Sequence, residues 1–325
     1  GYGVCLIFNQ QLTPGQLVSF TIYLGMLSWP LIALGDTVNI MQRGNASYDR
    51  IQAILDEKPE VQDPKTPKAI GSSFQTLEVR DLSFRYPKGE QDVLKKISFT
   101  LKRGETLGIV GKTGSGKTTI IRQLLKQYLP KDGAIYINGI NILEARTKEV
   151  RALFGYVPQE HILFKGTVKD NIAFGKEKAT DEEIEKAIDL ASFRKDLAFL
   201  DHGMDTVVGE HGVKLSGGQK QRLSIARAFV LDPEILILDD SLSAVDGTTE
   251  KEILSRLKHE RKNRTTIIVA HRLSAVEHAD HIIVLDNGRI IEQGNHDELM
   301  ALNGWYARQY RHQQMVRDEV LKDGH

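Results

Sequence analysis

The chain has 325 residues, with 43 acidic and 43 basic side chains and one cysteine. The balanced charge argues against a broad nucleic-acid-binding surface, and the single Cys5 excludes an intramolecular disulfide. The ten histidines show no tight metal-ligand spacing. The length is sufficient for one large domain with an additional membrane segment.

The first part of the chain is apolar. Residues 17–34 carry no charge and are long enough to be a membrane-span candidate, and residues 2–8 form a shorter apolar run. Arg43 and Arg50 follow the long run, which is typical of a cytoplasmic exit. A signal peptide is disfavoured because no basic region precedes the run. The alternative is a buried helix of a soluble domain.

A linker and a strand-rich segment come next. Residues 57–73 are polar and contain Pro59, Pro64 and Pro67, as linkers do. From Phe74 onward, short apolar runs predict strands, and residues 160–214 predict helices. Residues 282–292 predict a hairpin with its turn at 286–288.

Residues 111–118 match the phosphate-binding pattern G-x-x-x-x-G-K-[ST]. A predicted strand at 107–110 precedes them and a helical pattern at 118–128 follows, which is the context that this motif requires. The glycines let the backbone surround a phosphate, Lys117 would reach the β- and γ-phosphates, and the Thr118 hydroxyl would bind Mg²⁺. The expected nucleotide-binding residues here are Gly111, Thr113, Gly114, Ser115, Gly116, Lys117, Thr118 and Thr119. A flexible Gly/Ser loop is the weaker alternative.

A second metal ligand is predicted at Asp239. It ends the apolar run 235–238, and so lies at the carboxyl edge of a predicted central strand, where ligands bind in open α/β sheets. We expect Asp239 to hold Mg²⁺ through water. A solvated aspartate that merely ends a strand is the alternative.

Further motifs surround these two. They are Phe84-Arg-Tyr-Pro87, Val157-Pro-Gln159, Leu215-Ser-Gly-Gly-Gln219, Ser243-Ala-Val-Asp246, and His271 after a predicted strand. Together with residues 111–118 and Asp239, they make the chain resemble the nucleotide-binding half of an ABC transporter of the exporter type. The resemblance covers nearly all of residues 1–312.

The resemblance implies a role for each motif. Tyr86 would stack on adenine, Gln159 would contact Mg²⁺ and sense the membrane domain, and His271 would touch the γ-phosphate. The loop at 206–212 would face the coupling helices. The signature residues Ser216, Gly217, Gly218 and Gln219 would bind the ATP held by the opposite subunit of a head-to-tail dimer. Taken alone, Tyr86 is more often an ordinary strand aromatic, and His271 more often a surface histidine.

Asp240 departs from the family pattern. In the family, the position after the metal-binding aspartate of the Walker B motif, here Asp239, is usually Glu, which orients or deprotonates the attacking water. Asp is shorter by about 1.3 Å, and a misplacement of about 1 Å can cost on the order of 10²-fold in rate. With Asp240, His271 and Gln159 as the catalytic residues, we expect this site to bind ATP and hydrolyse it slowly. This resembles heterodimeric bacterial multidrug exporters; the alternative is a working homodimer.

The expected fold class is α/β: a P-loop NTPase of the ABC ATPase type, with a RecA-like core, an antiparallel β-subdomain and a helical subdomain, preceded by a transmembrane α-helical segment. The expected domains are the end of the membrane domain (1–56), a linker (57–73), the nucleotide-binding domain (74–312) and a polar tail (313–325). Because the chain begins with Gly, we expect a fragment of a subunit nearly twice as long.

The expected function is that of the ATP-hydrolysing subunit of a membrane exporter for a lipophilic or drug-like substrate, with ATP and Mg²⁺ as cofactors. The membrane domain would be multi-pass and the nucleotide domain cytoplasmic. The expected partner is a second half-transporter subunit, with a heterodimer favoured and no nucleic acid involved. The alternatives are a homodimeric lipid or peptide exporter and a soluble ABC ATPase, against which residues 17–34 argue. The signature motif argues against a P-loop kinase, and the missing Asn-Lys-x-Asp motif against a GTPase.

Overall fold

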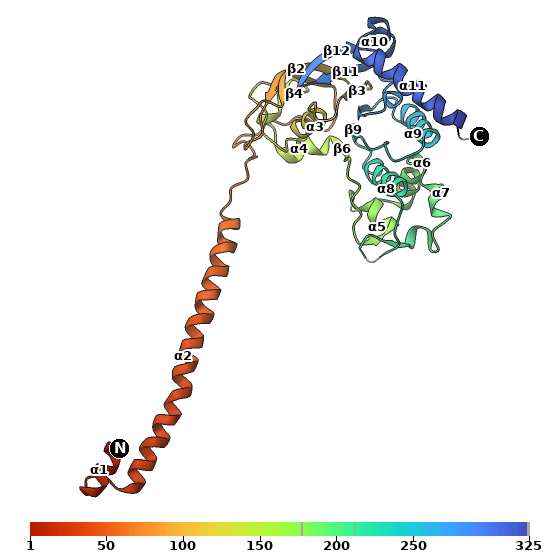
Figure 1. Cartoon of the computed structure of the whole chain (residues 1–325). Coiled ribbons are helices and arrows are strands. Elements are labelled where there is room, and N and C mark those ends of the chain that lie inside the picture. Colours follow the sequence, from red (N-terminus) through yellow and green to blue (C-terminus); the bar gives the residue numbers. More distant parts are fainter. Residues whose placement is uncertain (177, 211, 324–325) are drawn as a thin grey trace. The chain divides into compact units, whose positions relative to one another are not determined.

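The computed structural model describes residues 1–176, 178–210 and 212–323 (Figure 1). The chain divides into two units between Pro59 and Glu60. Two sequence predictions reach beyond the described residues: the loop 206–212 includes residue 211, and the polar tail includes residues 324 and 325.

The first unit consists of helices α1 (Tyr2–Phe8) and α2 (Pro14–Leu55). Thr13 and Gln16 cap the start of α2 reciprocally, and Pro14 fits there because a first-turn amide has no partner in the helix. The 42 residues of α2 correspond to about 63 Å of helix. None of them is buried, and α2 is long and apolar enough to cross a membrane. The predicted span 17–34 lies within it.

Residues 60–73 of the predicted linker group with the second unit. A carboxylate oxygen of Asp63 accepts a hydrogen bond from the Thr147 amide at 2.7 Å, and the Lys68 amide donates to the Glu144 carbonyl at 2.8 Å. Ile70 is buried. This part of the linker is therefore fixed to the surface of the second unit.

The second unit is built on a six-stranded sheet in the order β12-β11-β3-β10-β9-β6. Five strands are parallel, and β12 pairs antiparallel with β11 in the predicted hairpin. Their bounds are β3 (Thr106–Gly111), β6 (Phe154–Val157), β9 (Ile235–Asp239), β10 (Thr265–Val269), β11 (His281–Asp286) and β12 (Arg289–Gly294).

Two smaller sheets and a set of helices complete the unit. The antiparallel sheet has the order β2-β1-β4-β5, with bounds β1 (Thr76–Phe84), β2 (Leu94–Lys102), β4 (Ile135–Ile137) and β5 (Ile140–Asn141). A short pair joins β7 (Gly166–Thr167) to β8 (Val207–Val208). The helices are α3 (Lys117–Leu124), α4 (Thr147–Ala152), α5 (Val168–Ala173), α6 (Asp181–Leu190), α7 (Arg194–Leu197), α8 (Gly217–Phe229), α9 (Gly247–Glu260), α10 (His296–Leu302) and α11 (Trp305–Asp323). Three 3₁₀ turns are η1 (Ile142–Glu144), η2 (Gly203–Asp205) and η3 (Leu273–Ala275).

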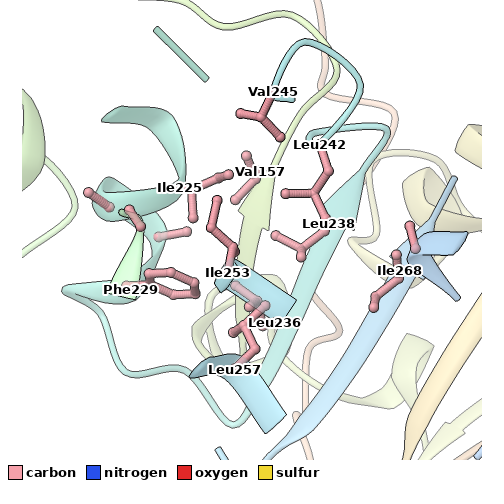
Figure 2. Close-up of a cluster of buried hydrophobic side chains, with 14 of the residues drawn as sticks. Val157, Ile225, Phe229, Leu236, Leu238, Leu242, Val245, Ile253, Leu257 and Ile268 are labelled. Atoms are coloured by element: carbon pink, nitrogen blue, oxygen red, sulfur yellow. The ribbon is translucent and has the colours of Figure 1, made fainter. Parts of the chain in front are cut away.

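The central strands are buried on both faces, which explains their continuous apolar sequences. In Figure 2, Leu236 and Leu238 of β9 lie near Ile225 of α8 and Ile253 of α9. The alternate β9 residues, such as Ile237, belong to a second cluster with the antiparallel sheet. The predicted α/β class, with an antiparallel sheet and a helical part, is confirmed.

Helix α3 ends earlier than the pattern at 118–128 predicts. Lys126 has a left-handed φ of 51° and is buried, and its ammonium donates to the Ala145 carbonyl at 2.7 Å. Arg151 donates to the carbonyls of Leu125 and Lys126 at 3.0 Å each. These tertiary contacts satisfy the helix end and stop it at Leu124.

Helix α11 continues past the predicted domain boundary between residues 312 and 313. The fully buried Tyr306 hydroxyl is 2.8 Å from His296 Nδ1, and the Tyr310 hydroxyl donates to Glu277 at 2.8 Å. Residues 313–323, which were predicted as part of a polar tail, continue this helix.

Candidate functional site: a phosphate loop at the sheet edge

The loop between β3 and α3 depends on its glycines. Gly111, Gly114 and Gly116 have φ angles of 147°, 77° and 104°, which side-chain-bearing residues rarely adopt. A Cβ on Gly111 would lie 2.1 Å from the Leu285 carbonyl oxygen, and one on Gly116 would lie 2.8 Å from a Leu94 methyl carbon. A side chain at any of the three positions would therefore strain the loop, and at Gly111 and Gly116 it would also collide with neighbouring atoms.

The loop presents a cation and a polar hydroxyl to its interior. The buried Lys117 ammonium donates to the carbonyls of Gly111 and Lys112 at 2.9 Å each, and burial lowers its pKa. The Ser115 hydroxyl is buried and has no hydrogen-bond partner among the described residues. A cation bonded to backbone carbonyls and an unpaired buried hydroxyl fit a polyphosphate. Thr113 is exposed at the tip of the loop.

Thr118 and Asp239 form a pair suited to Mg²⁺. The Thr118 hydroxyl donates to an Asp239 carboxylate oxygen at 3.3 Å, and the Tyr156 hydroxyl donates to the other at 3.2 Å. Burial raises the pKa of Asp239, and these two hydrogen bonds oppose the rise. Oxygen ligands from one hydroxyl and one carboxylate, completed by phosphates and water, are typical of Mg²⁺ sites. Both residues therefore fit the predicted metal.

Gln159 contacts the residue that follows Asp239. Its amide nitrogen lies 3.4 Å from a carboxylate oxygen of Asp240, at the long end of hydrogen bonding. Asp240 itself has a left-handed φ of 49°. Gln159 is thus placed beside the predicted catalytic carboxylate. Its predicted contact with Mg²⁺ stays a prediction.

His271 lies at the same edge of the sheet. It follows β10, whose Val269 pairs in register with Asp239, so the two chain segments leave the sheet side by side. Its side chain is exposed. The carboxyl ends of β3, β6, β9 and β10 thus bring together the phosphate loop, Gln159, Asp239, Asp240 and His271, as parallel strands in such folds do.

Tyr86 is part of an aromatic cluster against α3. Its ring packs edge-on against Phe84 and Tyr128, with centroid distances of 5.0 and 5.1 Å. Its hydroxyl is 3.1 Å from the Thr119 hydroxyl and accepts from Arg122 at 3.2 Å. The structure thus brings Tyr86 and Thr119 together, and the adenine contact stays a prediction.

The signature residues begin α8. The Ser216 hydroxyl accepts from the Gln219 amide at 3.3 Å, and the Gln219 side chain accepts from the Ser216 amide at 2.9 Å. This capping box is the local reason why the helix starts here. Ser216 and Gly217 are exposed. No hydrogen bond recorded in the described ranges joins residues 216–219 to the phosphate loop.

Sequence reasoning missed two residues at this edge, Tyr156 and His161. Tyr156 lies on β6 beside β9, three residues before Gln159, and a polar aromatic in a strand preceding a site loop was the available signal. His161 follows Gln159 by two residues, its Nδ1 is buried without a recorded partner, and burial lowers its pKa against the attraction of Asp240.

Comparison with known proteins identifies the family. Residues 94–243 match the family model described as ABC transporter. The chain is 54% identical, over 98% of its length and 54% of the relative's, to the probable multidrug resistance ABC transporter ATP-binding/permease protein YheI of Bacillus subtilis. It is 45% identical, over 97% of its length and 53% of the relative's, to the multidrug resistance-like ATP-binding protein MdlA of Escherichia coli. The chain spans about half the length of these relatives.

A solved structure agrees. The chain superposes with a TM-score of 0.82 and 38% identity on a bacterial Atm1-family ABC exporter with ATP bound, over 93% of this chain and 53% of the other. ABC ATPase domains bind ATP with Mg²⁺ and hydrolyse ATP, and the phosphate loop and the Thr118–Asp239 pair fit these ligands. On its motifs, its fold and these similarities, the chain contains the ATP-binding domain of an ABC transporter.

Proposed function

We propose that the chain is the ATP-driven part of a membrane ABC exporter subunit. The observation that carries this proposal is the convergence of the phosphate loop, Asp239, Asp240, Gln159 and His271 at one edge of the parallel sheet. Lys117 would hold the β- and γ-phosphates, and Thr118 and Asp239 would hold Mg²⁺. ATP hydrolysis would supply the energy for transport.

The signature supports a head-to-tail dimer. Ser216 and Gly217 are exposed at the start of the 13-residue helix α8. The amides of a helix N-terminus bind phosphate well, yet in the described part of the chain no hydrogen bond joins this helix start to the chain's own phosphate loop. We infer that it completes the ATP site of a second subunit, and that the partner's signature completes this one. This would be the role of Ser216, Gly217, Gly218 and Gln219.

Two loops would connect the ATP site to the membrane domain. The segment after Gln159 leads to Phe164, and Gly209 approaches it so closely that a Cβ there would lie 2.7 Å from the Phe164 carbonyl oxygen. β7 and β8 pair next to this contact. A movement at Gln159 would therefore reach the loop containing Gly209, which we infer faces the membrane domain. Helix α2 would be the last transmembrane helix, leaving the nucleotide domain in the cytoplasm.

The cargo and the partner are inferred from chemistry and relatives. Two relatives are described as multidrug resistance proteins, which favours a lipophilic or drug-like substrate. Asp240 favours a site that hydrolyses ATP slowly and a heterodimer with a catalytically stronger subunit. A homodimeric exporter is the second candidate, because His271 and the signature residues are all present.

The test is ATP-dependent uptake of ethidium, a lipophilic cation, by inside-out vesicles that contain the natural subunit, alone and with its partner. Lys117→Met should abolish uptake and lower ATP affinity. The matched control is Lys112→Met, because Lys112 belongs to the same loop but its side chain is exposed. Equal uptake in both variants would refute an ATP-driven role. Full ATP turnover without uptake of any lipophilic probe would refute the substrate class.

A further inference from the structure

The side chain of Gln313, on α11, spans the segment that begins with His271. Its Oε1 accepts a hydrogen bond from the Leu273 amide at 2.9 Å, and its Nε2 donates to the His271 carbonyl at 2.9 Å. One carboxamide thus pairs with the backbone on both sides of Arg272, in the way that a neighbouring strand would. This fixes the course of residues 271–273.

Arg272 extends this contact to the D-loop, residues 243–246. Its guanidinium donates to the Ser243 carbonyl at 3.0 Å and to the Val245 carbonyl at 3.1 Å. It also donates at 3.1 Å to Glu250, which is 3% exposed and which accepts from Ser274 at 3.0 Å. The Val245 side chain lies in the core (Figure 2). The D-loop is therefore held by the packing of the Val245 side chain in the core and by the hydrogen bonds that Arg272 donates to its carbonyls.

The backbone is the main determinant of where His271 lies. Among the hydrogen bonds recorded for the described residues, none involves its imidazole, and the ring is exposed. The anchoring of α11 makes Gln313 a firm support, because Tyr310, three residues earlier on the same helix face, donates to Glu277. Fixing the His271 carbonyl thus limits where the ring can go.

We propose that Gln313 is a positioning residue of the ATPase site. It acts through the backbone of residues 271–273, setting the place of His271 directly and that of the D-loop through Arg272. The inference rests on the proposed function, since it takes His271 as the γ-phosphate contact. It also places within the catalytic domain a residue that composition alone assigned to a polar tail.

Two substitutions separate the two hydrogen bonds. Gln313→Met keeps a side chain of similar length and removes both, whereas Gln313→Glu keeps the acceptor for Leu273 and loses the donor to His271. Gln314→Met, at the next position of α11, is the matched control because Gln314 takes no part in this contact. The measurements on the natural subunit are the hydrogen exchange of the Leu273 amide without nucleotide, and kcat and KM for ATP.

For Gln313→Met we expect Leu273 exchange to be roughly 3- to 10-fold faster, as the loss of one or two hydrogen bonds implies. We expect kcat to fall by a similar factor while KM stays within about twofold, because the phosphate loop is untouched. Gln313→Glu should keep Leu273 protected and still lower kcat, and Gln314→Met should change neither quantity.

Unchanged exchange in Gln313→Met would overturn the contact itself. Faster exchange with unchanged kcat would leave Gln313 a purely structural residue and overturn the proposal, as would an equal fall of kcat in Gln314→Met. If wild-type turnover is too slow to measure, kcat and KM are compared in the Asp240→Glu background, and a subunit that stays inactive there too would count against the proposed function. In that case the exchange measurement would still decide whether Gln313 holds the segment.

Discussion

Replacing Asp240 by Glu tests the chemistry of the site most directly. Asp240 stands where the family usually has the carboxylate that orients or deprotonates the attacking water. Its carboxylate already lies 3.4 Å from the Gln159 amide nitrogen, at the outer limit of a hydrogen bond. Glu extends the carboxylate by about 1.3 Å, and we expect this added reach to bring it closer to the attacking water.

The magnitude follows from geometry. A displacement of about 1 Å is worth on the order of 10²-fold in rate, or about 2.7 kcal/mol in activation free energy. The backbone opposes this gain slightly: Asp240 has a φ of 49°, and aspartate tolerates the left-handed region better than glutamate does. We therefore expect Asp240→Glu to raise kcat by about 10- to 100-fold and to lower the free energy of unfolding by about 1 kcal/mol.

The assay is phosphate release by the purified natural subunit, without a partner, for the wild type, Asp240→Glu and Asp240→Asn. The double variant with Lys117→Met reports contaminating activity. Negligible wild-type turnover with a large gain in the Glu variant would support a slow site and a subunit that depends on a stronger partner. Rapid wild-type turnover that Glu leaves unchanged would refute this reasoning and favour a homodimer.

Three further predictions concern stability, pH and metal binding. Arg222→Met should lower the free energy of unfolding, measured by chemical denaturation, by about 3 kcal/mol. The reason is that it leaves the largely buried Asp196 without its two 2.7 Å hydrogen bonds. As a control, breaking the exposed ion pair between Lys68 and Glu144 should cost under about 1 kcal/mol in the same assay. Burial lowers the pKa of His161 below its usual 6.5, so at lower pH the unfolded chain binds more protons than the folded one. The free energy of unfolding should therefore fall as the pH drops below about 6.5. His161→Gln should weaken this loss in denaturation curves recorded between about pH 5 and pH 7. Thr118→Ala should raise the Mg²⁺ concentration needed for tight ATP binding by about tenfold or more, measured by titrating Mg²⁺ against a fluorescent ATP analogue; an unchanged titration would remove Thr118 from the metal site.

The sequence predicts those residues of the site whose role depends on a short continuous segment of the chain. The phosphate loop needs glycines at fixed spacing, and the structure shows why, since Cβ atoms at Gly111 and Gly116 would meet neighbouring atoms. Asp239 was likewise predictable, because an apolar run that ends in a carboxylate places that group at the sheet edge. Such residues carry their signal within a few positions of chain.

Residues that act across elements carried no such signal. Tyr156 reaches Asp239 only because β6 lies beside β9, and Gln313 reaches the His271 segment only because α11 packs against η3. Similarly, the chain leaves the helix after Leu124, where Arg151 from a later helix donates to the carbonyls of Leu125 and Lys126. Spacing along the chain contains none of these contacts, since each depends on how the elements pack.

At position 240 the backbone conformation and the catalytic chemistry favour different residues. Its φ of 49° favours Asp or Asn over Glu, whereas reach toward the attacking water favours Glu. If the backbone alone explained this aspartate, Asp240→Asn would match the wild type in both stability and turnover. If its charge takes part in slow hydrolysis, Asn should keep the stability and lose the remaining turnover. Comparison of Asp240→Asn with the wild type therefore separates an aspartate kept for its backbone conformation from one whose charge takes part in hydrolysis.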